Sequence, residues 1–309
     1  MMSNETTRVI NETAIEETQT APQRTGLTRP PDDPVLPDKP VVLNDAEATS
    51  AAFNLRDIWA YRELLYFLTW RDIKVKYKQT AMGAAWAIIQ PLFMVIVFAV
   101  FFGLFMQVPT DNMPHLVFFY CGLMPWIFFS TALGMCSNSL INNTNLITKI
   151  YFPRTIIPLS TIGAGLPDLL ITVAILFSIM FYYGFAPTWH LLMLPVMLLL
   201  MMGLATGIGI WLAALTVRFR DVRHALPFVI QLWFFTTPIV YPLSVVPEKW
   251  HWAMYLNPMT GIIEGVRSAI AGRNFNWTAI EISAGIALVM FMASIYAFRR
   301  LEKSFADLL

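Results

Sequence analysis

Charged residues are scarce in this sequence of 309 residues. Asp, Glu, Lys and Arg make up 13% of it, whereas hydrophobic residues make up 57%. Soluble domains usually carry about 25% charged residues. The deficit is concentrated, because no charged residue occurs between Gln79 and Thr110 or between Leu169 and Val217. Each stretch exceeds the roughly 20 apolar residues that a helix needs to cross a bilayer. The composition excludes a soluble globular protein and predicts an all-α integral membrane protein.

Groups that carry catalysis or bind metals are also few. The four histidines lie on separate segments without metal-site spacing, and no paired-carboxylate cluster or G-x-S-x-G motif occurs. No lysine follows a glycine, which excludes a P-loop. Cys121 and Cys136 are about 22 Å apart if helical, too far to bridge, and are interpreted as core residues. We expect no enzyme activity, metal or cofactor in this chain, so any ATP and Mg²⁺ would bind a separate subunit.

A basic domain is absent as well, since the net charge is +1, and we expect no nucleic-acid partner. Residues 1–50 hold nine acidic residues against four basic ones, with six prolines between Pro22 and Pro40. Such a segment cannot bury enough apolar area to offset its ordering entropy. We therefore predict a disordered acidic Pro-rich tail. It contains no apolar core of a signal peptide.

Residues 51–80 mix aromatic and basic side chains, and their apolar core, Leu64–Trp70, is too short to span a bilayer. This mixture is typical of an amphipathic helix lying in the headgroup layer. The alternative is a soluble amphipathic helix packed on another element. Its position directly before the first apolar stretch favours the interfacial helix.

Residues 81–309 are predicted to form a membrane domain with six transmembrane helices. The spans are Met82–Met106, Leu116–Ser137, Ile156–Tyr183, Leu191–Val217, Ala225–Tyr241 and Trp277–Phe298. Fourteen Lys and Arg residues flank one set of span ends and only Lys249, Arg267 and Arg273 flank the other. Because basic residues concentrate on the cytoplasmic side, both termini are predicted to be cytoplasmic.

The connection between spans five and six runs from Pro242 to Asn276 and is rich in hydrophobic residues that prolines and glycines interrupt. Two short helices dipping back into the outer leaflet would fit, because non-helical backbone at that depth is tolerated against protein or water. We predict an outer re-entrant hairpin. The alternative is an amphipathic loop on the membrane surface.

Asp168 is the one acidic residue deep inside a predicted span. A charge there costs roughly 2.5–3.5 kcal/mol on insertion scales, so it should face protein or water. Without an evident series of ionisable partners, a structural role is favoured over a proton relay. Aromatic faces can also stack on sugar rings, and a glycan path is hypothesised from residues that are otherwise interpreted as packing. They are Trp126, Phe129, Trp233, Phe234 and Tyr241.

Several short motifs occur in order along the chain. They are KYKQTAMGAAWAIIQPL from Lys76 to Leu92, KIYFPRTIIP from Lys149 to Pro158, RFRDV from Arg218 to Val222, TPIVYP from Thr237 to Pro242, Asn257–Pro258, and E-x-x-R at Glu264 and Arg267. Taken together, in this order and spacing, they resemble type-2 ABC exporter permeases that move polysaccharides. The similarity covers about residues 53–309.

This resemblance implies a homodimer of this chain with two copies of a cytoplasmic ABC ATPase. The cargo would be a lipid-linked glycan, such as O-antigen, capsule or teichoic acid, crossing the bacterial cytoplasmic (inner) membrane. Other readings remain open: a type-2 exporter of a drug, haem or another lipid, a proton-coupled carrier using Asp168, or a membrane-bound glycosyltransferase. Missing inverted repeats and acidic clusters disfavour the last two.

Three candidate sites follow for such an exporter. ATPase docking is expected at the connection before span three, with exposed Tyr151 and Phe152, so that Phe152→Asp would uncouple the ATPase. The docking residues are Asn145, Lys149, Tyr151, Phe152, Pro153 and Arg154. Entry of a pyrophosphate headgroup is expected at Arg71, Lys74, Lys76 and Lys78, or these bases simply attract anionic lipid. An outer gate is expected at Asn257, Glu264 and Arg267, where Glu264 and Arg267 would pair, contact the glycan or cap the loop.

Overall fold

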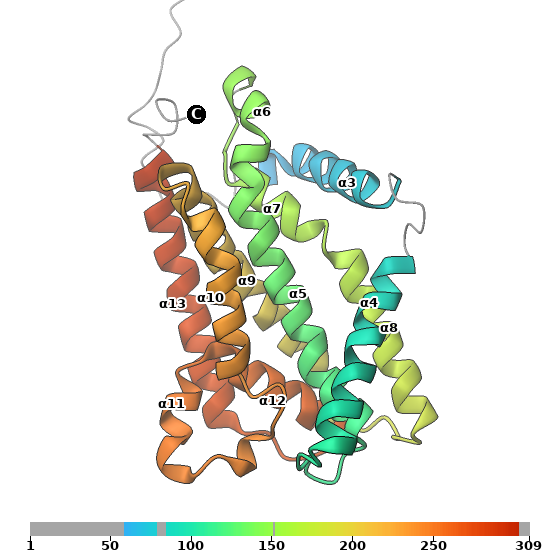
Figure 1. Cartoon of the computed structure of the whole chain (residues 1–309). Helices are drawn as coiled ribbons and strands as arrows, with labels where there is room; N and C mark the ends of the chain where they lie inside the picture. Colours follow the sequence, from blue (N-terminus) through green and yellow to red (C-terminus); the bar gives the residue numbers. More distant parts are fainter. Residues whose placement is uncertain (1–58, 79–84, 151, 303–309) are drawn as a thin grey trace, which may run out of the picture. The chain divides into compact units, whose positions relative to one another are not determined.

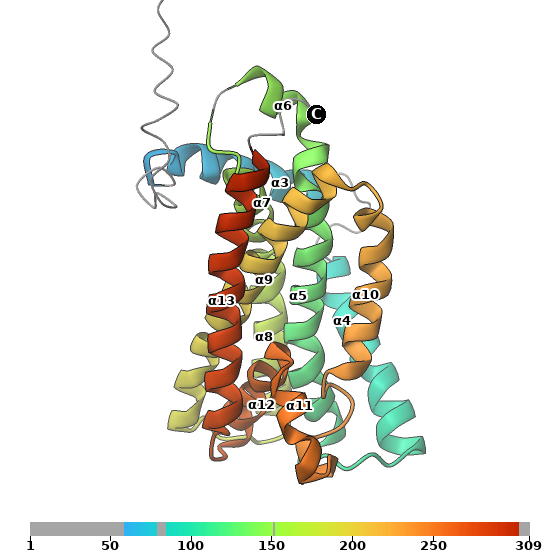
Figure 2. The same cartoon turned by 90° about the vertical axis from the view of Figure 1, so that its left-hand side faces the viewer.

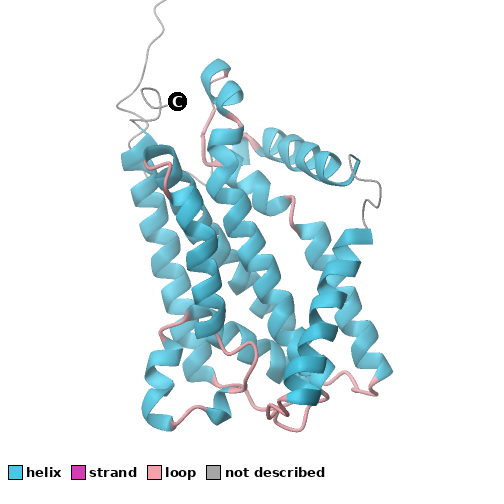
Figure 3. Cartoon of the chain, viewed as in Figure 1, coloured by secondary structure: helices cyan, strands magenta, loops and turns pink. Residues whose placement is uncertain are grey.

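The computed structural model describes residues 59–78, 85–150 and 152–302, and within these ranges every regular element is a helix (Figures 1 and 3). They belong to one unit, Ala52–Leu309. The predicted tail, residues 1–50, lies outside the described residues.

Five helical segments are long and apolar enough to cross a membrane. The first consists of α4, Ala85–Phe98, continued by the π-helix η3, Ala99–Phe105. The others are α5 (His115–Asn142), α7 with α8 (Ile156–Gly163 and Leu166–Tyr182), η4 with α9 (Trp189–Met193 and Leu194–Arg218) and α13 (Trp277–Glu302). Five of the six predicted spans therefore coincide with these segments, with boundaries close to those found.

The fifth predicted span is shorter than expected. Helix α10 comprises Val222–Thr236, 15 residues, and ends before Tyr241. At 1.5 Å per residue its length is about 22 Å, less than the roughly 30 Å of bilayer hydrocarbon. The cause is local, because Thr237 is extended, with φ −96° and ψ 136°, as favoured before Pro238. A sixth full-length span is thus not confirmed.

Short helices follow α10: η5 (Leu243–Val245), η6 (Glu248–Trp250), α11 (His251–Tyr255) and α12 (Pro258–Ala271). They lie at the end of the bundle where α10 ends and α13 begins (Figures 1 and 2). Helix α12 is buried along most of its length and packs on α5, α9 and α13. It begins at the N-cap Asn257 and ends at Gly272, whose φ of 65° favours glycine.

Helix α3, Arg62–Lys78, lies across the opposite end of the bundle and packs on α7 (Figure 1). The short helix α6, Thr144–Lys149, projects from the same end. Trp59, Tyr66 and Phe67 are exposed near the start of α3, whereas Leu68 is buried. A helix therefore occupies Arg62–Lys78 of the predicted segment, with one side packed on α7, and its place in the headgroup layer stays a prediction.

The core has two parts. The larger one surrounds α5, which occupies the middle of the bundle in both views (Figures 1 and 2). The smaller one, which we call the end core, joins the elements near α3 and α6. Its buried residues are Leu68, Leu140, Ile147, Phe152, Ile156, Ile157, Ile210, Ala213, Ala214, Val217 and Phe298.

Glycines permit close helix contacts around α13. A Cβ placed on Gly207 of α9 would lie 2.9 Å from the backbone of Phe291. A Cβ on Gly261 of α12 would lie 2.2 Å from the carbonyl oxygen of Ala279. Small residues allow such approaches in membrane proteins, where apolar lipid gives helices little hydrophobic reason to associate.

Candidate functional site

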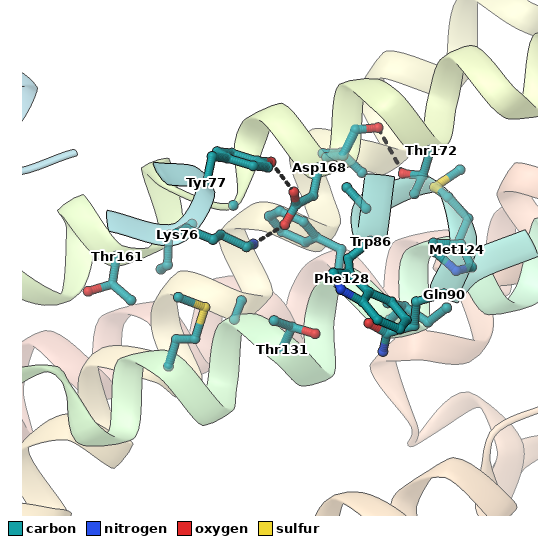
Figure 4. A pocket seen from close by; sticks show the side chains of 18 residues that line it. Lys76, Tyr77, Trp86, Gln90, Met124, Phe128, Thr131, Thr161, Asp168 and Thr172 are labelled. Carbon is teal, nitrogen blue, oxygen red and sulfur yellow. Dashed lines mark hydrogen bonds and ion pairs between the residues drawn. The ribbon is translucent and has the colours of Figure 1, made fainter. Parts of the chain in front are cut away.

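A cavity of about 370 Å³ lies between the end of α3 and helices α4, α5, α7 and α8 (Figure 4). Its lining is mostly apolar, with Met124 and Phe128 on α5 and Leu169 on α8. Polar side chains enter it from four helices: Lys76 and Tyr77 from α3, Gln90 from α4, Thr131 from α5 and Asp168 from α8. An apolar chamber with a few convergent polar groups is the usual form of a small-molecule site.

Asp168 is held by two residues from the last turn of α3. Lys76 forms an ion pair with its carboxylate, and the Tyr77 hydroxyl donates a hydrogen bond to it (Figure 4). The third span breaks between α7 and α8, so Asp168 lies in the first turn of α8, where a helix favours negative charge (Figure 3). Burial, together with the hydrogen bond to Asp168, raises the pKa of the Tyr77 phenol. The phenol therefore remains a proton donor.

This arrangement revises two expectations. Asp168 was expected to have no evident ionisable partners, yet it contacts two side chains more than 90 positions earlier. Lys76 was predicted to receive a pyrophosphate headgroup, yet its charge is already compensated by Asp168. Lys76 and Asp168 meet because the C-terminal end of α3 lies beside the first turn of α8.

The other three predicted headgroup residues differ in their surroundings. Arg71 donates to Asp72 at 2.9 and 2.7 Å and to Asn143 at 2.9 Å. Lys74 is exposed, with its Nζ 5.4 Å from the centre of the Trp70 ring. Lys78 is exposed as well. Only Lys74 and Lys78 of the four predicted bases are therefore exposed at this end of the bundle.

The predicted docking segment is only partly exposed. Asn145 and Lys149 lie on α6 and are exposed, and Pro153 and Arg154 are half-buried. Tyr151 lies outside the described residues. Phe152 was predicted to be exposed, but this is wrong: it is 5% exposed, because the chain turns back from α6 into α7 and inserts this ring into the end core.

Four of the five residues of the hypothesised glycan path form one aromatic cluster between α5 and α10. The Phe129 ring is 5.1 Å from that of Trp233, and the Trp126 ring is 5.6 Å from that of Phe234. Trp126 and Phe129 are buried. The cluster packs two helices together and does not line the cavity.

The fifth, Tyr241, follows α10 and is half-buried. Its carbonyl oxygen is 3.5 Å from the guanidinium of Arg267. Tyr241 therefore belongs with the outer contacts of α12 and lies apart from the aromatic cluster.

Of the three alternatives for Glu264 and Arg267, pairing is observed. Arg267 Nη1 donates to Glu264 Oε1 at 2.8 Å. The guanidinium also donates to the carbonyl oxygens of Pro238 and Ile239, each at 2.8 Å, and lies 3.7 Å from the centre of the Phe118 ring. This buried fork fastens α12 to the segment after α10 and to α5.

Asn257 makes a second connection at the same place. Its Oδ1 accepts from the backbone N–H of Met259 at 3.1 Å and from Trp233 Nε1 at 2.9 Å. Its Nδ2 donates to the hydroxyl of Thr237 at 2.8 Å. One side chain therefore begins α12 and also fixes the end of α10.

The sequence did not indicate Trp86, Gln90 or Thr131 as site residues. Gln90 and Thr131 are uncharged polar residues inside apolar stretches, which is the one signal that could have identified them. Both are exposed, and neither makes a hydrogen bond with any residue that the structure describes.

Comparison with known proteins places the chain among exporters. It is 28% identical over 256 residues to the O-antigen export system permease protein RfbA of Myxococcus xanthus. The aligned residues cover 82% of this chain and 98% of that protein. It is 30% identical to RfbA of Klebsiella pneumoniae over 80% of this chain and 95% of the relative. The polysialic acid transport protein KpsM of Escherichia coli is 24% identical over 71% of this chain and 89% of that protein.

The model of the family described as ABC-2 type transporter matches residues 63–271. These residues run from α3 to the last residue of α12 and include the cavity, α6 and the Glu264–Arg267 pair. Because the match covers more than half of the chain, this protein belongs to the ABC-2 type transporter family.

Proposed function

We propose that this chain is the permease subunit of an ABC exporter that moves a polyprenyl-linked polysaccharide across the bacterial cytoplasmic membrane. One observation carries the proposal: the likeness to O-antigen export permeases extends over 98% of a relative's length. ATP and Mg²⁺ would bind a separate ATPase, because this sequence has no P-loop. Two copies of the ATPase would serve a homodimer of this chain.

The proposed orientation places the α3 end of the bundle in the cytoplasm. Every described lysine and arginine except Lys249, Arg267 and Arg273 lies on α3 or α6, near the ends of α9, α10 and α13 on that side, or in the turns that follow α6 and α9. A strong bias of this kind marks the cytoplasmic side of membrane proteins. In this orientation α3 lies in the headgroup layer, α10 is the fifth of six crossings, and α11 with α12 forms the outer re-entrant hairpin.

Helix α6 is the proposed docking element for the ATPase. It projects beyond the bundle (Figure 1) and exposes Asn145 and Lys149. Ile150, which follows directly, is exposed as a large apolar side chain. Polar and apolar groups exposed side by side suit a protein partner. Phe152, which is buried in the end core, and the half-buried Pro153 and Arg154 would hold this surface in position.

Lys74 and Lys78 are the proposed contacts for the phosphates of the lipid carrier. Both are exposed on the last turns of α3, the helix whose Lys76 and Tyr77 line the cavity. Ion pairs between ammonium and phosphate are charge-assisted. Arg71 and Lys76 already have carboxylate partners and would join only by exchanging them.

The outer hairpin is the proposed gate. For the hairpin to move away from α10, the bonds of Arg267 to Pro238 and Ile239 and those of Asn257 to α10 must break. Glu264 would then retain Arg267 as its partner within α12. A disulfide engineered between α12 and the end of α10 should stop export while assembly with the ATPase persists. Full export by the crosslinked protein would exclude the gate.

Depletion of this protein in its native host tests the function. Mass spectrometry of the membrane lipids should then show accumulation of a polyprenyl-linked glycan, and purification of the protein should recover an ATP-hydrolysing subunit. An unchanged lipid pool with a co-purifying ATPase would favour a type-2 exporter of a drug, haem or another lipid. Absence of any ATPase would contradict the ABC assignment of the complex.

A further inference from the structure

The three threonines that line the cavity are not equivalent. The Thr161 hydroxyl donates to the carbonyl oxygen of Ile157 at 3.0 Å, and that of Thr172 donates to Leu169 at 2.9 Å. Both hydroxyls are therefore satisfied by their own helices. The Thr131 hydroxyl makes no hydrogen bond within the described part of the chain, so it is available to a ligand.

Gln90 presents a second free polar group to the same space. Its amide comes from α4 and makes no hydrogen bond to the described residues. Trp86, one turn earlier on α4, offers an aromatic ring to the cavity. Figure 4 shows Trp86 and Gln90 near Phe128 and Met124, with Asp168 above this group and Thr131 below it. The cavity thus combines unpaired hydrogen-bonding groups with aromatic and apolar walls.

The charges at the cavity disfavour an anionic or cationic ligand. Lys76 and Asp168 form an ion pair that contributes no net charge. A phosphate that approached Lys76 here would meet the Asp168 carboxylate, and like charges at close range repel strongly. A purely apolar ligand is also disfavoured, because it would remove Gln90, Thr131 and Asp168 from water without replacing their hydrogen bonds.

A neutral ring with several hydroxyl groups meets each condition. Its hydroxyls can donate to the Asp168 carboxylate, where a charged acceptor strengthens the bond. They can also exchange hydrogen bonds with Gln90 and Thr131, while the C–H faces of the ring contact Trp86 and Phe128. A volume of about 370 Å³ lies in the range of small-molecule sites.

We propose that this cavity is a saccharide-binding pocket that recognises neutral sugar rings of the exported glycan. The pocket lies inside one subunit, and Gln90, Thr131 and Asp168 select the sugar by its hydroxyl pattern. This inference rests on the proposed function and adds to it a specificity-determining site distinct from the phosphate contacts at Lys74 and Lys78.

The test uses the full chain with its ATPase, purified together and reconstituted in lipid nanodiscs. The probe is a short oligosaccharide released from the host's own lipid-linked glycan, and its binding is measured by calorimetry. Thr131→Val should weaken binding by about two- to tenfold, the usual value of one neutral hydrogen bond, and Gln90→Leu by a similar factor. Basal ATPase activity of each variant reports on folding and assembly.

Thr161→Val and Thr172→Val are matched controls in the same cavity. Each removes a hydroxyl already bonded to its own helix, so oligosaccharide affinity should change less than twofold. If the threonines acted only through packing, Thr161→Val and Thr172→Val would weaken binding more than Thr131→Val, because Thr161 and Thr172 are buried whereas Thr131 is exposed. Equal weakening by all three substitutions would therefore overturn the proposal.

Two further outcomes separate this inference from the proposed function. A wild-type complex that exports lipid-linked glycan in vesicles but does not bind the oligosaccharide would overturn the pocket and leave the function intact. A complex that neither exports nor binds would remove both. Binding of a polyprenyl phosphate without sugar that depends on Thr131 would assign the cavity to the lipid carrier and refute the saccharide.

Discussion

Replacement of Arg267 by Met should cause a large loss of stability. The guanidinium is buried and holds Glu264 and the carbonyl oxygens of Pro238 and Ile239, each at 2.8 Å. Removing one partner of a buried ion pair costs about 3–5 kcal/mol, because the remaining charge loses its compensation. Each buried carbonyl left without a donor adds about 1–3 kcal/mol, and the contact with Phe118 is lost as well.

These contributions overlap, and the added methionine regains some apolar contact. We therefore expect the free energy of unfolding to fall by about 4 kcal/mol. Glu264→Gln is the matched control. It removes the counter-charge of Arg267, but the guanidinium keeps its bonds to the carbonyl oxygens of Pro238 and Ile239 and the new amide oxygen still accepts, so it should cost less, about 1–2 kcal/mol. Combining the two substitutions should cost less than the sum of both, because no unpaired carboxylate then remains.

The assay is unfolding of the purified protein in mixed micelles with increasing denaturing detergent, followed by tryptophan fluorescence. A loss below about 1 kcal/mol for Arg267→Met would refute the reasoning, because it would mean that the fork contributes little. A double variant whose cost equals the sum would contradict the inferred coupling between Arg267 and Glu264.

Three other predictions concern single substitutions, two of them with a matched control. Gly261→Ala should abolish stable expression, because its Cβ would overlap the backbone of α13, whereas Gly285→Ala, with open space around it, should express like wild type in a membrane-fraction blot. Asn257→Ala should lower the free energy of unfolding in the micelle assay by about 1–2 kcal/mol through loss of its cap, and wild-type stability would contradict this. Phe152→Asp should prevent folding by burying a charge, whereas exposed Lys149→Glu should fold normally and lower ATPase stimulation in the reconstituted complex.

The membrane-spanning segments could be predicted from the sequence because a single physical property, apolar length, determines them. The charge-free stretches before Thr110 and after Leu169 coincide with helices long enough to cross. Length failed as a criterion only for α10, where Pro238 ends the helix. The apolar residues continue past Pro238, but the helical backbone ends before it.

The sites were harder to predict, because contacts between distant segments decide them. Glu264 and Arg267 are three residues apart on one helix, so local geometry made pairing one of the three alternatives, and it is the one observed. The partners of Asp168 come from a different helix, and nothing in the local sequence identifies them. Phe152 stands in a polar connection and was predicted to be exposed, but the residues that cover it come from several helices.

The end core has a mechanical consequence. It joins α3, α5, α6, α7, α9 and α13, whereas no described residue of α4 or α10 belongs to it. Close-packed side chains transmit displacement because they have little free volume to absorb it. A displacement of α6 would therefore move these joined helices together as one rigid body, and α4 and α10 would slide against it. The third span is joined to the end core through α7, whereas the first and fifth spans have no described residue in it. Helices α4 and α10 therefore form the more easily displaced side of the subunit, where such a movement would separate neighbouring helices.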